Sequence, residues 1–168
     1  MNGIGLMIGM GGAARYSLSS TRPDSDTHRT AFTHALLLAA LCALFFSFAG
    51  AFCSEEISAI LGADHDTIGY ASDYIRILLL FSPLFLGNNL LLCFVRNDGA
   101  PRLSMAGMLI GSLANIVLDY IFIYPLGMEM AGAATATATA PVISMLIMSV
   151  HFIKKNNRFH ITKIRLSL

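Results

Sequence analysis

Four long apolar stretches decide what this chain can fold into. They run approximately over residues 31–52, 70–95, 103–124 and 131–153. A helix rises about 1.5 Å per residue, so roughly 20 apolar residues cross the hydrocarbon core of a bilayer, which is about 30 Å thick. Hydrophobic residues make up 55% of the 168 residues and charged residues only 12%. A soluble domain of this size cannot bury so much apolar surface, and we therefore expect an all-α, polytopic membrane helix bundle.

A fifth apolar stretch opens the chain and is shorter than the others. As a helix, residues 1–14 would span about 21 Å, and we expect a partial helix over about 1–19. This helix begins at the first residue without a cap or a polar flank, as the later part of a longer helix would. The expected organisation is a transmembrane bundle over 1–153 and a basic tail over 154–168, within a chain that is a fragment.

The distribution of charge predicts the side of the membrane on which each connection lies. Lys and Arg occur in the first and third connections and in the tail, whereas the second and fourth connections are acidic. Because basic loops stay in the cytoplasm, we expect those two connections and the C-terminal tail to lie on the cytoplasmic side of the cell (inner or plasma) membrane. Arg76 is the exception, and Asp73, one turn earlier, is close enough to pair with it.

Several other classes of function lack support in the sequence. Cys42, Cys53 and Cys93 have no partner at metal-ligand spacing, and the histidines are scattered over loops and helix ends, where we interpret most of them as solvated. No Walker-type lysine and no complete dinucleotide fingerprint is present. No nucleophile is accompanied by a base and an orienting partner. We therefore expect neither an enzyme nor a cofactor, and no nucleic-acid partner.

One carboxylate lies inside an expected span. Asp119 follows Asn115 by four residues, and Gly111 and Gly107 continue the same spacing, so one face of this helix is small and polar. We expect this face to point into the bundle. An unpaired charge in the bilayer costs about 3 kcal/mol on insertion scales, which makes Asp119 a functional candidate by default. The alternative is a protonated Asp119 that bonds to Asn115 or to a neighbouring helix and serves packing.

The preceding helix contains a pair of amides, Asn88 and Asn89. They follow Pro83, which lacks an N–H group and can kink the helix and free a carbonyl near the middle of the membrane. Amides at this depth can line a cavity, and packing between helices is the competing interpretation.

The last span contains an Ala/Thr run. Thr135 and Thr139 share one face of the helix and Thr137 lies on nearly the opposite one, so the three hydroxyls cannot all serve one site. We expect most of them to pack closely and to hydrogen-bond to their own backbone. GxxxG pairs over 5–9 and 107–111 likewise indicate close approach between helices.

The order of these segments resembles the multidrug and toxic compound extrusion (MATE) family of secondary transporters. The opening GIGLMIGMGGAARYSLS is similar to the second helix of that family, and FVRNDGAPRLSM to its cytoplasmic connection between helices four and five. NIVLDYIFIYPLG followed by AGAATAT is similar to helices five and six. The resemblance covers essentially the whole chain. It implies helices two to six of the N-terminal lobe of a two-lobe, twelve-helix transporter, with helix one and the C-terminal lobe as the missing partners.

The resemblance also implies a site. In that family an N-lobe site of carboxylate, amide and hydroxyl oxygens binds sodium ions or protons, and Asp119, Asn115 and Thr137 match it by position. Asn88 matches the amide of helix four, with Asn89 as the alternative. No metal is implied beyond a sodium ion at these residues.

The function implied by the resemblance is secondary active transport within the lipid bilayer. The parent protein would export drugs or other amphipathic organic compounds, often cations, in exchange for sodium ions or protons. Two alternatives remain open. The first is a non-transporting membrane fragment or assembly partner. The second is a flippase for lipid-linked precursors, for which we would expect a more basic cavity.

Overall fold

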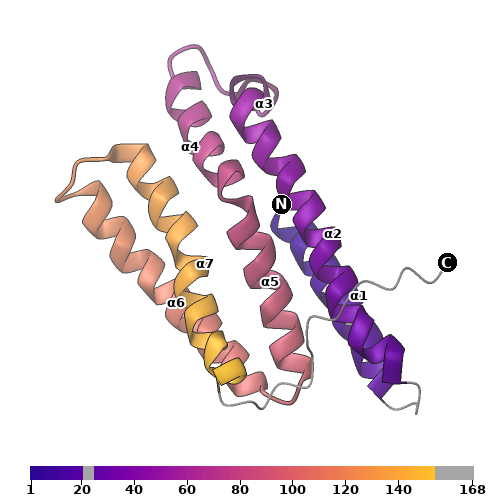
Figure 1. Cartoon of the computed structure of the whole chain (residues 1–168). Coiled ribbons are helices and arrows are strands. Elements are labelled where there is room, and N and C mark those ends of the chain that lie inside the picture. The colour runs from indigo at the N-terminus through magenta and orange to yellow at the C-terminus, as the bar shows by residue number, and fades with distance from the viewer. Residues whose placement is uncertain (21–24, 154–168) are drawn as a thin grey trace.

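The computed structural model describes residues 1–20 and 25–153, which form an elongated bundle of helices without strands (Figure 1). The basic tail over 154–168 lies outside the described residues. The helices are α1 (Asn2–Ser20), α2 (Ser25–Phe52), α3 (Ser54–Ile60), α4 (Ile68–Leu80), α5 (Ser82–Asn97), α6 (Pro101–Ile123) and α7 (Glu129–Ile153). Within α2, α6 and α7 there are 3 stretches long and apolar enough to cross a membrane, and α4 with α5 forms a fourth if the pair is counted as one bent span. The all-α membrane bundle is confirmed.

The second of the four expected spans is broken into two helices. α4 ends at Leu80 and α5 begins at Ser82, and the two helices are bent by 50°. Pro83 lies in the first turn of α5, where its missing N–H costs no helical hydrogen bond. At the break, the Leu80 carbonyl accepts a hydrogen bond from the Ser47 hydroxyl of α2 at 3.2 Å. The kink expected from Pro83 is therefore present, and α2 satisfies part of the backbone that it exposes.

The connection between α2 and α4 contains a short helix, α3, that the apolar pattern did not predict. Glu55 and Glu56 lie in its first turn, where negative charge favours the positive end of the helix dipole. Gly62 follows the helix with a φ of 94°, a conformation that glycine adopts without strain.

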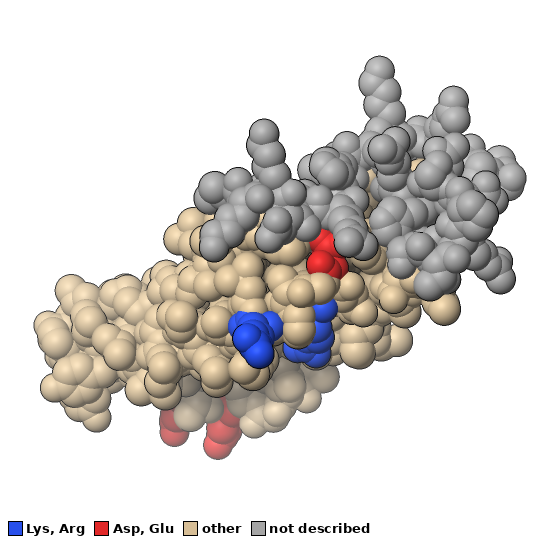
Figure 2. All heavy atoms as spheres, turned by 90° about the horizontal axis from the view of Figure 1, so that it is seen from below, with Lys and Arg blue, Asp and Glu red and all other residues tan. Residues whose placement is uncertain are grey.

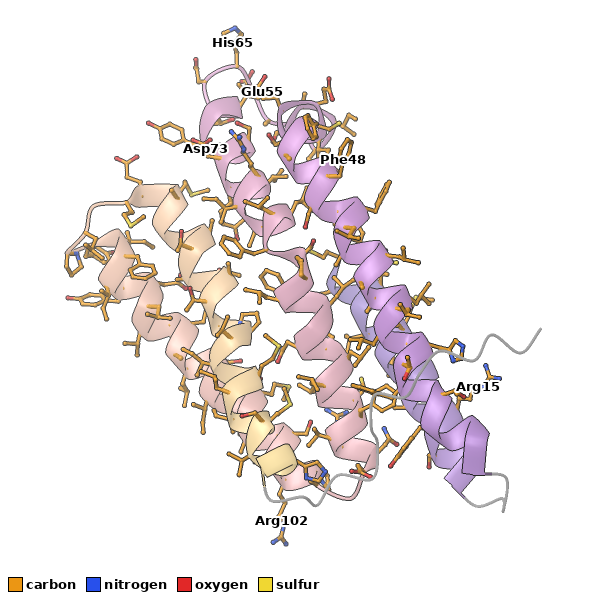
Figure 3. All side chains as sticks on the ribbon, in the orientation of Figure 1. Arg15, Phe48, Glu55, His65, Asp73 and Arg102 are labelled. Atoms are coloured by element: carbon orange, nitrogen blue, oxygen red, sulfur yellow. The ribbon has the colours of Figure 1, made fainter. Side chains whose placement is uncertain are left out.

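The two ends of the bundle differ in charge. Figure 3 shows Glu55, His65 and Asp73 toward one end, which we call the acidic end, and Arg102 at the other, which we call the basic end. Figure 2 looks onto the basic end and shows basic side chains close together there. Asp73 and Arg76 form no ion pair within the described part of the chain.

Glycines allow two pairs of helices to approach closely, as the GxxxG spacing predicts. A Cβ atom at Gly9 of α1 would lie 3.0 Å from both the Asn89 carbonyl oxygen and the Cys93 Sγ of α5. A Cβ atom at Gly111 of α6 would lie 3.1 Å from the Ser144 Cβ of α7. Larger residues at these positions would force the helices apart.

The outer faces of α2 and α6 are covered with large apolar side chains. The most exposed of these are Leu41, Leu44, Phe45, Phe48 and Phe52 on α2, and Leu113, Ile116, Val117 and Tyr120 on α6. Apolar faces of this size are suited to hydrocarbon rather than to water. Together with the candidate spans, they identify a multi-pass membrane protein.

Candidate functional site

A cavity of about 380 Å³ is lined by residues from α1, α5, α6 and α7. Apolar side chains such as Leu6 and Phe85 form part of its wall. The polar part of its lining includes Asn88, Asn89, Ser112, Asn115, Thr137 and Ser144. Four of the residues singled out by the sequence, from three different helices, therefore meet at one cavity.

Several polar atoms at or near this cavity are buried and have no hydrogen-bond partner within the described part of the chain. They are the Oδ1 of Asn88, the Nδ2 of Asn115, the Oδ1 of Asp119 and the Oγ of Ser144. Leaving a buried polar group unpaired costs about 1–3 kcal/mol. Proteins rarely accept this cost unless water, an ion or a ligand completes the set. Three of these four atoms are oxygens, which can accept a hydrogen bond or bind a cation, whereas the Nδ2 of Asn115 can only donate a hydrogen bond.

Asp119 lies next to this cavity along α6 but is not among its lining residues. It follows Asn115 by one helical turn, about 6 Å, toward the acidic end. Because α6 ends at Ile123, the carboxylate is about one turn from the end of its helix. The residue is half-buried. Asp119 thus places a carboxyl group beside a cavity whose other polar side chains are amides and hydroxyls.

The two asparagines of α5 differ in their contacts. Asn89 donates from Nδ2 to the Oδ1 of Asn2 at 3.3 Å. It also packs against Gly5, where a Cβ atom would lie 2.9 Å from the Asn89 Nδ2. Asn88 keeps a buried Oδ1 with no partner among the described residues, so it has the more available oxygen of the two.

The threonines of α7 divide between two roles. Thr135 donates to the Ala131 carbonyl at 2.7 Å, and Thr139 donates to the Thr135 carbonyl at 2.8 Å. Both hydroxyls therefore return to their own helix, as expected. Thr137 lines the cavity instead.

A second groove, of about 410 Å³, lies between α1 and α2. Arg15, His34 and apolar side chains such as Met7 and Leu38 line it. The Arg15 side chain points away from the bundle (Figure 3). No carboxylate or side-chain amide faces this groove, so it offers few ligands to a cation.

Near the basic end lies a polar cluster that sequence reasoning missed. Tyr16 of α1 donates to the Oδ1 of Asp98 at 2.6 Å, and the Nε2 of His151 on α7 lies 2.9 Å from the Oδ2 of Asp98. The side chains of His151 and Asp98 are only 5% and 1% exposed, so His151 is buried in contact with a carboxyl group rather than solvated. We call these three residues the Asp98 cluster.

The comparisons with known sequences were consistent with one another. The MatE family model matches residues 2–121. The multidrug export protein MepA of Staphylococcus saprophyticus is 32% identical in an alignment of 161 residues that covers 92% of this chain and 34% of that protein. MepA of Staphylococcus aureus strain MSSA476 is 38% identical over 104 residues, which are 62% of this chain and 23% of that protein.

Solved structures show the same relationship. A multidrug resistance MATE family transporter of the MOP superfamily, in an inward-facing conformation, has a TM-score of 0.88 and 26% sequence identity, and covers 96% of this chain. An outward-facing conformation of such a transporter has a TM-score of 0.80, 26% identity and 91% coverage. The chain spans about a third of the length of these proteins, 37% and 34% respectively, and of MepA. It therefore corresponds to part of a larger transporter.

Proposed function

Because this chain belongs to the MatE family of multidrug efflux transporters, we propose that the intact protein exports amphipathic organic compounds, often cations, in exchange for sodium ions or protons. The relatives found are transporters rather than enzymes. One observation carries the proposal. The buried, unpartnered polar atoms of Asn88, Asn115 and Asp119 lie at or beside one cavity within the membrane bundle.

Asp119 is the ion-coupling residue in this proposal, with Asn88, Asn115 and Thr137 as oxygen ligands. A charged carboxylate within the bilayer is costly, and a proton or a cation held among oxygens removes that cost. Neutralisation at Asp119 would therefore allow its part of the transporter to change between two conformations. Binding of an organic cation would favour the charged carboxylate instead.

The basic end of the bundle is the cytoplasmic end in this proposal. Arg96 and Arg102 lie in or next to the connection between α5 and α6, and further basic residues follow α7 in the sequence. Positively charged connections are retained in the cytoplasm, which also places the C-terminal tail there.

The test is Asp119→Asn in the intact transporter, with ethidium as the exported cation and an imposed sodium or proton gradient. We expect normal membrane insertion and loss of gradient-driven export, because the amide cannot alternate between charged and neutral forms. The control is Asp73→Asn, which alters an exposed carboxylate of α4. Export that is unchanged in the Asp119 variant would exclude this residue from coupling.

A non-transporting fragment or assembly partner is the second candidate. The intact mass of the native polypeptide in its source membranes separates the two. A mass of about three times 18.1 kDa would match the length of the relatives and support the transporter. A mass near 18.1 kDa would support the second candidate. The flippase alternative has less support, because no Lys or Arg is among the residues found to line the cavity.

A further inference from the structure

The groove between α1 and α2 has a floor of small residues and large apolar side chains beside it. At Gly12 of α1, a Cβ atom would lie only 2.7 Å from the Cβ of Ala35 on α2, so the two helices are close together at this point. Ala35 is buried, whereas Met7 of α1 is 72% exposed and Leu38 of α2 is 51% exposed. Both of these long side chains line the groove and stand out from its floor.

The space beside Gly11 is open. Gly11 lines the groove, and a Cβ atom there would meet nothing within 4 Å. At Gly9 of the same helix, in contrast, a Cβ atom would lie 3.0 Å from a carbonyl oxygen of α5. The volume of the groove, about 410 Å³, is within the range of about 300–1,000 Å³ found for pockets that hold small molecules. The groove can therefore accommodate a ligand.

A cation lies toward one end of the groove. Arg15 is exposed, and its side chain points away from the bundle (Figure 3). The neighbouring residue, Tyr16, donates a hydrogen bond to Asp98, which directly follows α5, so Arg15 lies near the basic end of the bundle. Arg15 forms no ion pair with any residue that the structure describes. Its positive charge is therefore available to an anion outside the bundle.

His34 of α2 adds a second polar group near this cation. Because Gly12 lies opposite Ala35, His34 is less than one helical turn deeper in the bundle than Arg15. Its Nδ1 donates to the Thr30 carbonyl at 2.8 Å, which fixes the position of the ring. No carboxylate is among the described residues that line the groove. The polar end of the groove is thus suited to an anion and not to a cation.

The apolar part of the groove continues into the outer face of α2. Leu38, Leu41, Phe45 and Phe48 follow one another at spacings of three and four residues, which places them on one side of the helix. All four side chains are exposed and apolar, as expected for a surface in contact with hydrocarbon. A ligand of the groove can therefore enter from the bilayer.

A phospholipid combines the two chemical properties that the groove requires. Its phosphate can accept two parallel hydrogen bonds from a guanidinium group, and its acyl chain can pack against apolar side chains. Because the charge of Arg15 is not balanced by a carboxylate in the groove, a lipid with a net negative charge is favoured over a zwitterionic one. An amphipathic cation would be repelled by the same charge.

We propose that the groove between α1 and α2 binds one anionic phospholipid from the leaflet at the basic end of the bundle. The phosphate binds to Arg15, and one acyl chain lies over Gly11 between Met7 and Leu38. This site is separate from the cavity between α5, α6 and α7, and it does not depend on ion coupling at Asp119.

The test measures lipid binding to the intact transporter by native mass spectrometry. The protein in detergent is titrated with phosphatidylglycerol, or with phosphatidylcholine that has the same acyl chains. We expect the wild type to bind its first phosphatidylglycerol more tightly than phosphatidylcholine, and Arg15→Gln to weaken phosphatidylglycerol binding about fivefold. Arg102→Gln removes an exposed cation at the same end of the bundle but outside the groove, and this control should bind phosphatidylglycerol like the wild type.

Gly11→Leu tests the groove without changing any charge. The leucine side chain would occupy the open space beside Gly11, and its Cβ atom would meet no other helix. We therefore expect an unchanged or higher melting temperature, because leucine favours the helix more than glycine does. Phosphatidylglycerol binding should nevertheless weaken several-fold, because the acyl chain loses its contacts with the groove.

Three results would overturn the inference. Equal weakening by Arg15→Gln and Arg102→Gln would mean that the lipid responds only to the overall charge of the basic end. Unchanged binding in Gly11→Leu would mean that no acyl chain lies in the groove. A wild-type transporter without a preference for phosphatidylglycerol would mean that the groove is covered by another part of the protein or holds no anionic lipid.

Discussion

The carboxylate of Asp98, at the end of α5, lies 2.9 Å from the Nε2 of His151 near the end of α7. Its other oxygen accepts a hydrogen bond from Tyr16 of α1. One side chain therefore connects three helices that are far apart in the sequence. Because the pair is almost completely buried, its removal has consequences that a surface ion pair would not have.

We expect Asp98→Ala to destabilise the bundle by about 1–3 kcal/mol, because it removes two buried side-chain hydrogen bonds. The loss of helical circular dichroism on heating in detergent micelles measures this effect. Asp66→Ala, at an exposed position near the acidic end, should change stability by about 0.5 kcal/mol or less. Equal melting temperatures of the two variants would mean that the Asp98 cluster contributes little to stability.

Gly9→Leu should separate α1 from α5. The Cβ atom of the leucine would lie 3.0 Å from the Asn89 carbonyl oxygen and from the Cys93 Sγ. Because the carbonyl oxygen belongs to the backbone of α5, it can move only if the helix itself shifts. Gly11→Leu on the same helix is the control, because a Cβ atom there meets nothing within 4 Å. Reaction of the buried Cys93 with a thiol reagent, in a background without Cys42 and Cys53, should be faster in the first variant only.

Ser82→Ala should make the backbone less rigid at the bend between α4 and α5. The Ser82 hydroxyl is fully buried and donates to the Ala43 carbonyl of α2 at 3.0 Å, and it lies 3.1 Å from the Ser47 hydroxyl. The Ala43 carbonyl keeps its hydrogen bond within α2, so the loss of the hydroxyl should cost about 0.5–1.5 kcal/mol. Hydrogen exchange should become faster around residues 79–84. Exchange at the wild-type rate would show that the hydroxyl is dispensable.

Thr137→Val in the intact transporter should raise the sodium or proton concentration that gives half-maximal export. Valine keeps the shape of threonine but removes the oxygen that faces the cavity. Thr139→Val is matched in chemistry and helix, and its hydroxyl serves only the Thr135 carbonyl in the described structure. We expect the second variant to transport normally. If both variants respond alike, the position of the hydroxyl on the helix does not matter for coupling.

The helices could be predicted from the sequence because their apolar runs are long and their turns contain glycine and proline. The break at Phe81 was predictable only as a kink near Pro83. Its position depends on hydrogen bonds from Ser47 and Ser82 to backbone atoms of other helices, and such contacts leave no periodic pattern. The short helix α3 is too brief to show an apolar repeat.

Some of the polar residues of the candidate site could likewise be predicted from the sequence, whereas the Asp98 cluster could not. Asn88, Asn115 and Thr137 carry recognisable polar signals within apolar helices, and the structure brings them to one cavity. Asp98 and His151 are 53 residues apart, and each resembles an ordinary polar residue at a helix end. Their contact depends on how α5 and α7 pack against each other, and no local sequence pattern indicates that packing.

The bend between α4 and α5 is braced from α2 on both sides. The Leu80 carbonyl and the Ser82 hydroxyl are each tied to α2, and at Gly50 a Cβ atom would come within 2.5 Å of the Leu79 Cβ. A bend fixed in this way is a rigid feature of the fold rather than a hinge. When the transporter changes shape, α2, α4 and α5 should therefore turn together as one piece, and the movement should take place where this piece meets its neighbours.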